Sequence, residues 1–193
     1  MELIFATHNN NKVKEVTKML PSYLSMKSLT DINFFDEIEE TGTTFEKNAQ
    51  LKAKTIFDKT GKNIFADDSG LVIEALDGAP GVYSARYAGT GKDEDNIAKA
   101  LKELEGKTNR KAYFISIFCL ILDGKEYFFE GRVNATIATE IMGDNGFGYD
   151  PIFIPDGFSK SFAQMSPEEK NAISHRGKAV EKLNDFLTNL NVN

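Results

Sequence analysis

The sequence predicts one α/β domain, on the border of α+β, in which strands and helices are mixed along the chain around a single core. Segments with helical periodicity and clear end signals alternate with short apolar runs typical of buried strands. Two longer apolar runs, joined by Asp123-Gly124, predict one β-hairpin. The chain has 193 residues, 41% apolar and 27% charged, which suits one domain with a full core or one core drawn out into two lobes.

The first predicted elements are a strand at 3–7 and a helix at 11–20. Pro21 stops this helix, because proline cannot continue the hydrogen-bond ladder. One apolar face is formed by Val13, Val16, Met19 and Leu20.

Two further helices, at 43–61 and 93–106, carry signals at both ends. The signals are a Thr43–Glu46 capping box with Gly61 for the first helix, and an Asp93 cap with Gly106 for the second. The second helix directs Ile97, Leu101 and Leu104 inward.

The run at 62–66 predicts a short buried strand, with Asp67 and Asp68 at its C-terminal edge before a Ser-Gly turn. Two adjacent carboxylates repel each other and lose solvation, so at least one requires a neutralising partner. That partner is expected to indicate the function.

The predicted hairpin covers 111–139 and contains the chain's single cysteine, Cys119. A lone cysteine in an apolar strand is a core residue, and no disulfide framework is available. The apolar face of the hairpin suits either the core or an interface between subunits.

The C-terminal helical stretch begins at Ser166, with Pro167 in its first turn and Glu169 completing a capping box. Its periodicity breaks at 174–177, where Ser174 starts a second helix that runs to about Leu190.

A net charge of −6 argues against sequence-independent nucleic-acid binding, which relies on a basic surface. The first ten residues lack the pattern of a signal peptide, and the longest apolar run is shorter than the roughly 20 residues that span a bilayer. The expectation is a cytoplasmic protein with no nucleic-acid or membrane partner.

Three polar loops contain more chemistry than a plain domain requires. The first, at 6–12, places three asparagines and Lys12 at a helix N-terminus, where backbone N–H groups favour a phosphate. A capped turn with solvated asparagines is the alternative, and the loop lacks the glycines of a Walker motif.

The second cluster contains four carboxylates, and Mg²⁺ prefers one or two of these together with substrate phosphates. A shared Mg²⁺ would offset the repulsion between neighbouring charges. A solvated acidic turn and an aspartate cap are the alternative. The four residues are Glu39, Glu40, Asp67 and Asp68.

The third cluster combines a glycine-rich loop at 143–153 with residues 168–176. The aromatic rings of Phe147 and Tyr149 suit stacking on a nucleobase, and Asp150 can accept a hydrogen bond from a ring N–H. Donors for a phosphate or a ring carbonyl are Lys170, His175 and Arg176, for which helix-end solvation is the alternative.

Five motifs occur in order along nearly the whole chain: ATHNNNK, EETGTTFEKNA, FADDSGLVIEALDGAPGVYSARYAG, GFGYDPIF and SPEEKNAISHRGKA. Together they resemble the inosine triphosphate pyrophosphatase family, the Ham1-like pyrophosphatases of non-canonical purine nucleoside triphosphates. The resemblance implies a Mg²⁺-dependent hydrolase that converts dITP, ITP and XTP to the monophosphate and pyrophosphate. It also implies an elongated mixed sheet flanked by helices, two lobes with a central cleft, and a homodimer.

The resemblance also assigns residue roles. The loop from Thr7 to Lys12 grips the triphosphate; it includes His8, where the family often has glycine, with Asn9, Asn10 and Asn11. Asp68 is the proton acceptor and a metal ligand, and Glu39 is the second ligand, with Glu40 adjacent to it as the alternative. Lys52 assists the phosphates, and Ser69 lies beside the substrate. The nucleobase and substrate contacts are Phe147, Gly148, Tyr149, Asp150, Lys170, His175 and Arg176.

In this interpretation Mg²⁺ polarises the phosphoryl oxygens while Lys12 and Lys52 stabilise charge on the leaving group. A donor such as Arg176, or a backbone N–H at 147–150, selects the 6-carbonyl of hypoxanthine or xanthine over the amine of adenine. Two other readings remain: a related pyrophosphatase of modified pyrimidine nucleotides, and a nucleotide-binding module without turnover.

Overall fold

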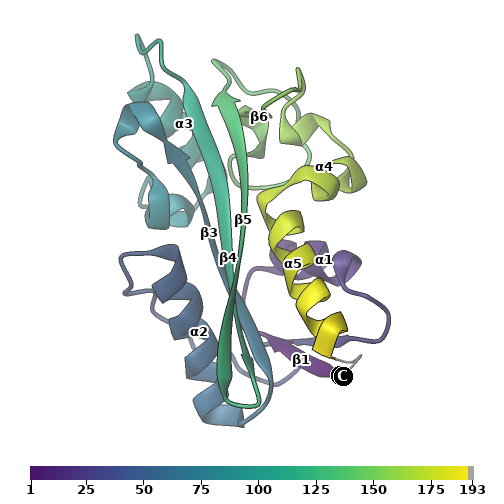
Figure 1. Cartoon of the computed structure of the whole chain (residues 1–193). Helices are drawn as coiled ribbons and strands as arrows, with labels where there is room; N and C mark the ends of the chain where they lie inside the picture. Colours follow the sequence, from purple (N-terminus) through teal and green to yellow (C-terminus); the bar gives the residue numbers. More distant parts are fainter. Residues whose placement is uncertain (191–193) are drawn as a thin grey trace. The chain divides into compact units, whose positions relative to one another are not determined.

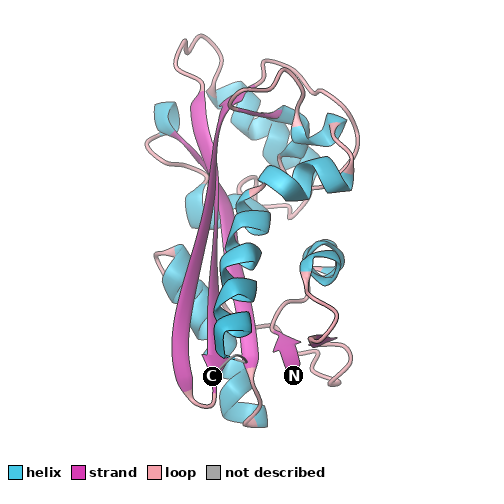
Figure 2. Ribbon diagram, turned by 45° about the vertical axis from the view of Figure 1, so that its right-hand side comes forward, coloured by secondary structure: helices cyan, strands magenta, loops and turns pink. Residues whose placement is uncertain are grey.

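The computed structural model describes residues 1–190 and confirms an α/β fold built on a mixed sheet (Figure 1). The described residues form six strands in the order β2-β1-β3-β4-β5-β6. Strand β1 pairs in parallel with β2 and β3, whereas β5 pairs antiparallel with β6. Figure 2 shows the strands in magenta and the helices in cyan. The strands are β1 (Glu2–Phe5), β2 (Ser25–Ser28), β3 (Ile64–Ile73), β4 (Lys111–Leu122), β5 (Lys125–Ile137) and β6 (Phe153–Pro155).

Five α-helices and four short 3₁₀ helices accompany the strands within the described residues. The α-helices are α1 (Asn10–Met19), α2 (Phe45–Thr60), α3 (Asp93–Glu103), α4 (Pro167–Ile173) and α5 (His175–Leu190). The 3₁₀ helices are η1 (Glu74–Leu76), η2 (Gly81–Arg86), η3 (Asp150–Ile152) and η4 (Phe162–Gln164).

The chain divides into two compact units, and β3, β4 and β5 each contribute residues to both. Unit 1 contains Met1–Asp68, Ser116–Gly131 and the residues from Arg176 onward. Unit 2 contains Ser69–Ile115 and Arg132–His175.

Unit 1 has three layers, with helices on both faces of its part of the sheet. One buried cluster joins Phe65 of β3 to α1 and α5, through residues such as Val16 and Leu183. A second joins Ala66, the next residue of β3, to α2 through Ala53 and Ile56. Figure 1 shows α2 on one side of the strands and α1 and α5 on the other.

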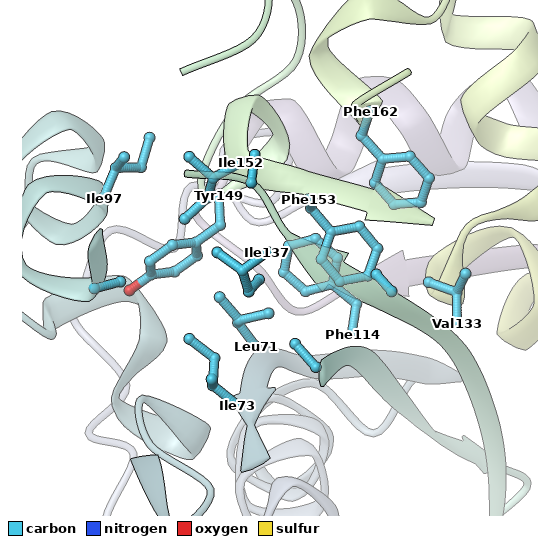
Figure 3. Packing of buried hydrophobic residues seen from close by; sticks show 14 of the residues in the cluster. Leu71, Ile73, Ile97, Phe114, Val133, Ile137, Tyr149, Ile152, Phe153 and Phe162 are labelled. Atoms are coloured by element: carbon cyan, nitrogen blue, oxygen red, sulfur yellow. The ribbon is translucent and has the colours of Figure 1, made fainter. Parts of the chain in front are cut away.

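Unit 2 is held by one large cluster rich in aromatic rings, shown in Figure 3. The ring of Phe114 lies 4.1 Å from that of Phe153, which lies 4.9 Å from Phe162. Tyr149 is 4% exposed and packs in the same cluster, together with Ile97 of α3. This core supports the glycine-rich loop that precedes η3.

Several predicted boundaries are confirmed. Asp123 and Gly124 both have positive φ, 49° and 77°, as a two-residue hairpin of the type I′ kind requires. Ser166 and Glu169 form the expected capping box, and Ser174 separates α4 from α5. Cys119 is buried in β4, and burial raises the pKa of its thiol to about 12.

Other predictions were wrong in detail. The N-cap of α2 is Thr44, not Thr43, and its side chain accepts from the Lys47 N–H. Asp93 is the first residue of α3 and not its cap, which is Lys92.

The largest difference concerns β3. Asp67 and Asp68 lie in the middle of this strand, and the expected Ser-Gly turn is part of it. The strand continues because the apolar residues Leu71 and Ile73 pack in the core of unit 2. Strands β2 and β6 were not predicted.

No helix in the part of the chain that the structure describes is both long and apolar enough to cross a bilayer.

Candidate active site

Strand β3 directs Asp67 and Asp68 toward opposite layers of unit 1, because successive side chains of a strand alternate between its faces. Asp67 shares the face of Phe65, which packs with α1 and α5. Asp68 shares the face of Ala66, which packs with α2. Each aspartate therefore meets its own set of partners.

Asp67 is fully buried and lies between two cations. Its Oδ2 is 2.9 Å from Lys12 Nζ and 3.6 Å from Arg176 Nε. Arg176 also donates to Glu15 at 2.5 Å. Arg176 therefore lies beside two carboxylates, while Asp67 has its charge neutralised by α1 and α5.

The loop before α1 aims Lys12 at this site. Asn9 is the N-cap, and its Oδ1 accepts from the backbone N–H groups of Asn11 and Lys12. Thr7 Oγ1 accepts from the Asn9 N–H at 3.2 Å. Burial lowers the pKa of Lys12, an effect that the Asp67 carboxylate partly opposes.

The remaining residues of this loop are exposed. Asn10 and Asn11 begin α1. His8 donates through Nε2 to the Asp36 carbonyl oxygen at 3.0 Å, and its ring lies 6.1 Å from that of Phe34. His8 thus ties the loop to the acidic segment that follows β2.

Asp68 is 4% exposed and meets two polar residues from successive turns of α2. Asn48 Nδ2 donates to Asp68 Oδ2 at 3.1 Å, and Lys52 Nζ lies 3.9 Å from Oδ1. Burial raises the pKa of Asp68 to about 6. A carboxylate with such a pKa is well suited to accept a proton near neutral pH.

Lys52 links Asp68 to the acidic loop. Its Nζ donates to Glu40 Oε1 at 2.5 Å. Burial alone would lower the pKa of Lys52, but the surrounding carboxylates, led by Glu40, raise it above the ordinary value. Lys52 therefore holds a full positive charge between two carboxylates.

The structure places Glu40, rather than Glu39, beside Lys52 and Asp68. Glu39 is exposed. Asn48 Oδ1 accepts from the Gly42 N–H at 2.8 Å and so fixes the end of the acidic loop against α2.

Asn48 was missed by the sequence analysis. The available signal was its position four residues before Lys52, on the same face of a helix.

Within residues 1–190, no three His, Cys, Asp or Glu side chains gather closely enough to hold a metal ion by themselves. Glu40 and Asp68 nevertheless fit a divalent cation. Mg²⁺ in nucleotide sites takes one or two carboxylates and completes its coordination with substrate phosphates and water. Both carboxylates already lie beside one positive charge, the ammonium of Lys52, so they are close enough together to share a cation.

Unit 2 contains the second polar cluster. Asp150 is 2% exposed, and its Oδ2 accepts from Lys170 Nζ at 2.7 Å and from the Phe147 N–H at 3.0 Å. Lys170 Nζ also lies 4.8 Å from the centre of the Phe147 ring. The buried ion pair thus holds Phe147 and Lys170 together.

The other predicted base contacts occupy different surroundings. Tyr149 lies in the core (Figure 3). Its hydroxyl donates to the Ser84 carbonyl oxygen at 2.7 Å. The Gly148 N–H donates to Asp93 Oδ2 at 2.7 Å. His175 is buried against Phe114, with ring centres 4.6 Å apart. Ser69 continues β3 and is half-buried.

Comparison with known proteins gives consistent matches along the chain. A model of the Ham1 family matches residues 3–186. The dITP/XTP pyrophosphatase of Flavobacterium johnsoniae is 51% identical over 189 residues, covering 97% of this chain and 98% of that protein. The dITP/XTP pyrophosphatase of Bacillus subtilis is 49% identical over 191 residues and covers 96% of each.

Solved structures agree. The Staphylococcus aureus Ham1 protein has a TM-score of 0.89 at 40% identity, over 98% of this chain and 99% of that one. A HAM1 protein from Coxiella burnetii has a TM-score of 0.90 at 40% identity, with the same coverage. The chain therefore belongs to the Ham1 family.

Proposed function

We propose that this protein hydrolyses the non-canonical purine nucleotides dITP, ITP and XTP to their monophosphates and pyrophosphate, and so removes them from the nucleotide pool. Relatives that are about half identical over nearly their full length are named dITP/XTP pyrophosphatases. The observation that carries the proposal is Asp68, a buried carboxylate with a raised pKa, held by Asn48 and Lys52.

Asp68 is the proposed acceptor of the proton from the attacking water. A general base works best when its pKa lies near the operating pH, and burial brings Asp68 closer to that condition than an ordinary aspartate. Lys12 and Lys52 are the proposed electrostatic partners of the triphosphate and of the charge that grows on pyrophosphate. The N-terminus of α1 adds backbone donors for an anion.

Mg²⁺ is the proposed cofactor, held by Asp68 and Glu40. When bound, it supplies positive charge that offsets the charge of the triphosphate. Lys52 keeps the two carboxylates together, and Asn48 fixes the orientation of Asp68.

Phe147 is the proposed stacking surface for the base, and Lys170 the proposed donor to its 6-carbonyl. The backbone N–H groups of Phe147, Gly148 and Asp150 each have one hydrogen to donate and already donate within the protein. A lysine ammonium carries three N–H groups, which favours the Lys170 side chain for this task. Adenine presents an amine where hypoxanthine presents a carbonyl. A buried donor facing that amine costs about 1–3 kcal/mol, enough to discriminate between them.

The family resemblance also supports a homodimer acting in the cytoplasm. Sedimentation analysis of the purified protein tests the dimer.

The function is tested by measuring pyrophosphate release from ITP, dITP, XTP, ATP and GTP, with and without Mg²⁺. We expect Mg²⁺-dependent turnover of the first three and its loss in Asp68→Asn. The matched control is Asp58→Asn on α2, because Asp58 is exposed and pairs with Lys54 across one helical turn.

Equal turnover of all five nucleotides would retain a hydrolase but contradict the assignment of the base contacts. Tight nucleotide binding without release would contradict catalysis altogether. Turnover restricted to modified pyrimidine triphosphates would contradict the purine assignment.

A further inference from the structure

The loop that carries Phe147 is hydrogen-bonded to a segment of unit 2 to which the proposed function assigns no role. This segment is residues 81–96, which contain η2 and the first turn of α3, and we refer to it as the bracket. Both the loop and the bracket lie within unit 2.

The first attachment is a hydrogen bond from the loop backbone to Asp93. The Gly148 N–H donates to Asp93 Oδ2 at 2.7 Å, a short bond to a charged acceptor. Asp93 is the first residue of α3, and the side chain predicted to cap this helix binds the loop instead.

The second attachment involves the next residue of the loop. Tyr149 Oη donates to the Ser84 carbonyl oxygen at 2.7 Å. Ser84 is itself fixed, because its Oγ accepts from the Leu71 N–H of β3 at 2.9 Å and donates to the Gly81 carbonyl at 2.6 Å. The tyrosine is therefore anchored to the sheet through η2.

The bracket is one connected unit. Asn96, which is 2% exposed, accepts from the Ala88 N–H at 2.7 Å and donates to the Ala85 carbonyl at 3.2 Å. These bonds join α3 to the end of η2. The Asp93 and Ser84 attachments thus come from a single internally bonded support.

The loop needs such support. Gly143, Gly146 and Gly148 all have positive φ, between 62° and 85°, a region that glycine reaches freely. A loop with this freedom loses conformational entropy for each residue that a ligand orders, and this loss weakens binding. A loop that is already fixed avoids this loss on binding.

We infer that Asp93 is a positioning residue for base recognition, which fixes the Gly148 peptide and thereby the orientation of Phe147. The inference rests on the proposed function of the loop. Asp93 binds the N–H that follows Phe147 in the chain, that of Gly148, whereas Asp150 binds the N–H of Phe147 itself.

Three variants separate this role from a general effect on the helix. Asp93→Ala removes the acceptor, whereas Asp93→Asn keeps an oxygen that can accept from Gly148. Glu94→Ala is the matched control, because it also removes an acidic residue from the first turn of α3. The readouts are amide exchange of Gly148 by NMR in the nucleotide-free protein, and KM and kcat for ITP and ATP.

We expect Asp93→Ala to speed Gly148 exchange and to raise KM for ITP about tenfold with a smaller change in kcat, the size of one lost hydrogen bond to a charged group. The ITP-to-ATP ratio of kcat/KM should fall. Asp93→Asn should recover most of the difference, and Glu94→Ala should match the wild type.

Unchanged Gly148 exchange in Asp93→Ala overturns the inference, as does an equal change in Glu94→Ala. So does faster exchange with wild-type KM values for both nucleotides. Failure of the proposed function would be recognised separately, because the wild-type protein itself would then show no preference for ITP.

Discussion

Asp67 and Asp68 are adjacent in the chain but are stabilised by different layers of unit 1. Asp67 lies between Lys12 and Arg176, while Asp68 is bound by Asn48 and lies near Lys52. The repulsion between neighbouring carboxylates is thus offset by partners on both faces of one strand. We expect the two residues to differ in what they contribute: Asp67 to stability and Asp68 to chemistry.

Removing Asp67 should destabilise the protein strongly. Asp67→Ala leaves the buried charges of Lys12 and Arg176 without their shared carboxylate, and breaking a buried ion pair costs about 3–5 kcal/mol. Chemical denaturation measures the loss. Asp58→Ala, which removes only an exposed pair on α2, should cost less than about 0.5 kcal/mol. Similar values for the two variants would contradict the role given to Asp67.

Replacing Asp68 should have the opposite effect on stability, in a pH-dependent way. Its pKa rises from 3.8 to about 6 on folding, so the folded state binds more protons than the unfolded state between these values. Stability therefore falls as pH rises through this interval, and the penalty is complete above about pH 7. Asp68→Asn cannot ionise and avoids the penalty.

We expect metal-free Asp68→Asn to be more stable than the wild type by about 1–3 kcal/mol near pH 8, with a smaller difference near pH 5. Thermal unfolding in the presence of a chelator tests this. A difference that stays constant between the two pH values would show that burial does not raise the pKa of Asp68.

At the scale of elements, the glycine-rich loop offers a matched pair of substitutions. Gly146 and Gly148 both have positive φ, 77° and 62°, so alanine strains the backbone at either position. A Cβ at Gly146 would overlap Asp150 Oδ2, whereas a Cβ at Gly148 would meet no described atom within 4 Å. Only the first substitution has to displace the carboxylate that holds Lys170 and Phe147.

Gly146→Ala should therefore lower kcat/KM for ITP at least about tenfold, because the Asp150–Lys170 pair loses its geometry. Gly148→Ala should cost only about 1 kcal/mol of stability and change kcat/KM little. Steady-state kinetics and chemical denaturation of both variants measure these two effects. Equal kinetic losses would mean that backbone strain alone, and not Asp150, controls the loop.

Elements with local signals could be predicted from the sequence. The helix ends at Gly61 and Ser174 and the turn at Asp123-Gly124 depend on short-range chemistry and are confirmed. Strands β2 and β6 could not be predicted, because they contain only four and three residues. They form by pairing with β1 and β5, and no signal within these short segments indicates that pairing.

The site followed the same rule. The need to neutralise the two aspartates was visible in the sequence, but the partners were not. Lys12 lies 55 residues from Asp67, and Asn48 lies 20 residues from Asp68. Only the pairing of β1 with β3 and the packing of α2 bring these residues together. The bond between Tyr149 and Ser84, which lies 65 residues away, likewise had no signal in the sequence.

At the scale of the whole molecule, the two units share three strands, since β3, β4 and β5 contribute residues to both. If one unit unfolded, these three strands would lose structure over part of their length while their remaining residues belong to the other unit. Backbone groups at the ends of the remaining strand segments would lose their hydrogen-bond partners. We therefore expect cooperative unfolding. In native-state hydrogen exchange, the amides of β4 at 112–115 and at 118–122 should open with the same free energy. A gap of more than about 2 kcal/mol between them would show that the units unfold independently.

The division of the chain also sets an order of completion during synthesis. Unit 1 begins before unit 2 along the chain, yet one side of its core is formed by residues of α5 that are made after the whole of unit 2. The α5 residues in this core are Ala179, Val180, Leu183 and Leu187. Unit 2 begins later, at Ser69, but all of its residues have been synthesised once the chain reaches His175. The unit that starts second can therefore fold first, and the nascent chain gains the second cation of Asp67 only when Arg176 and its helix emerge.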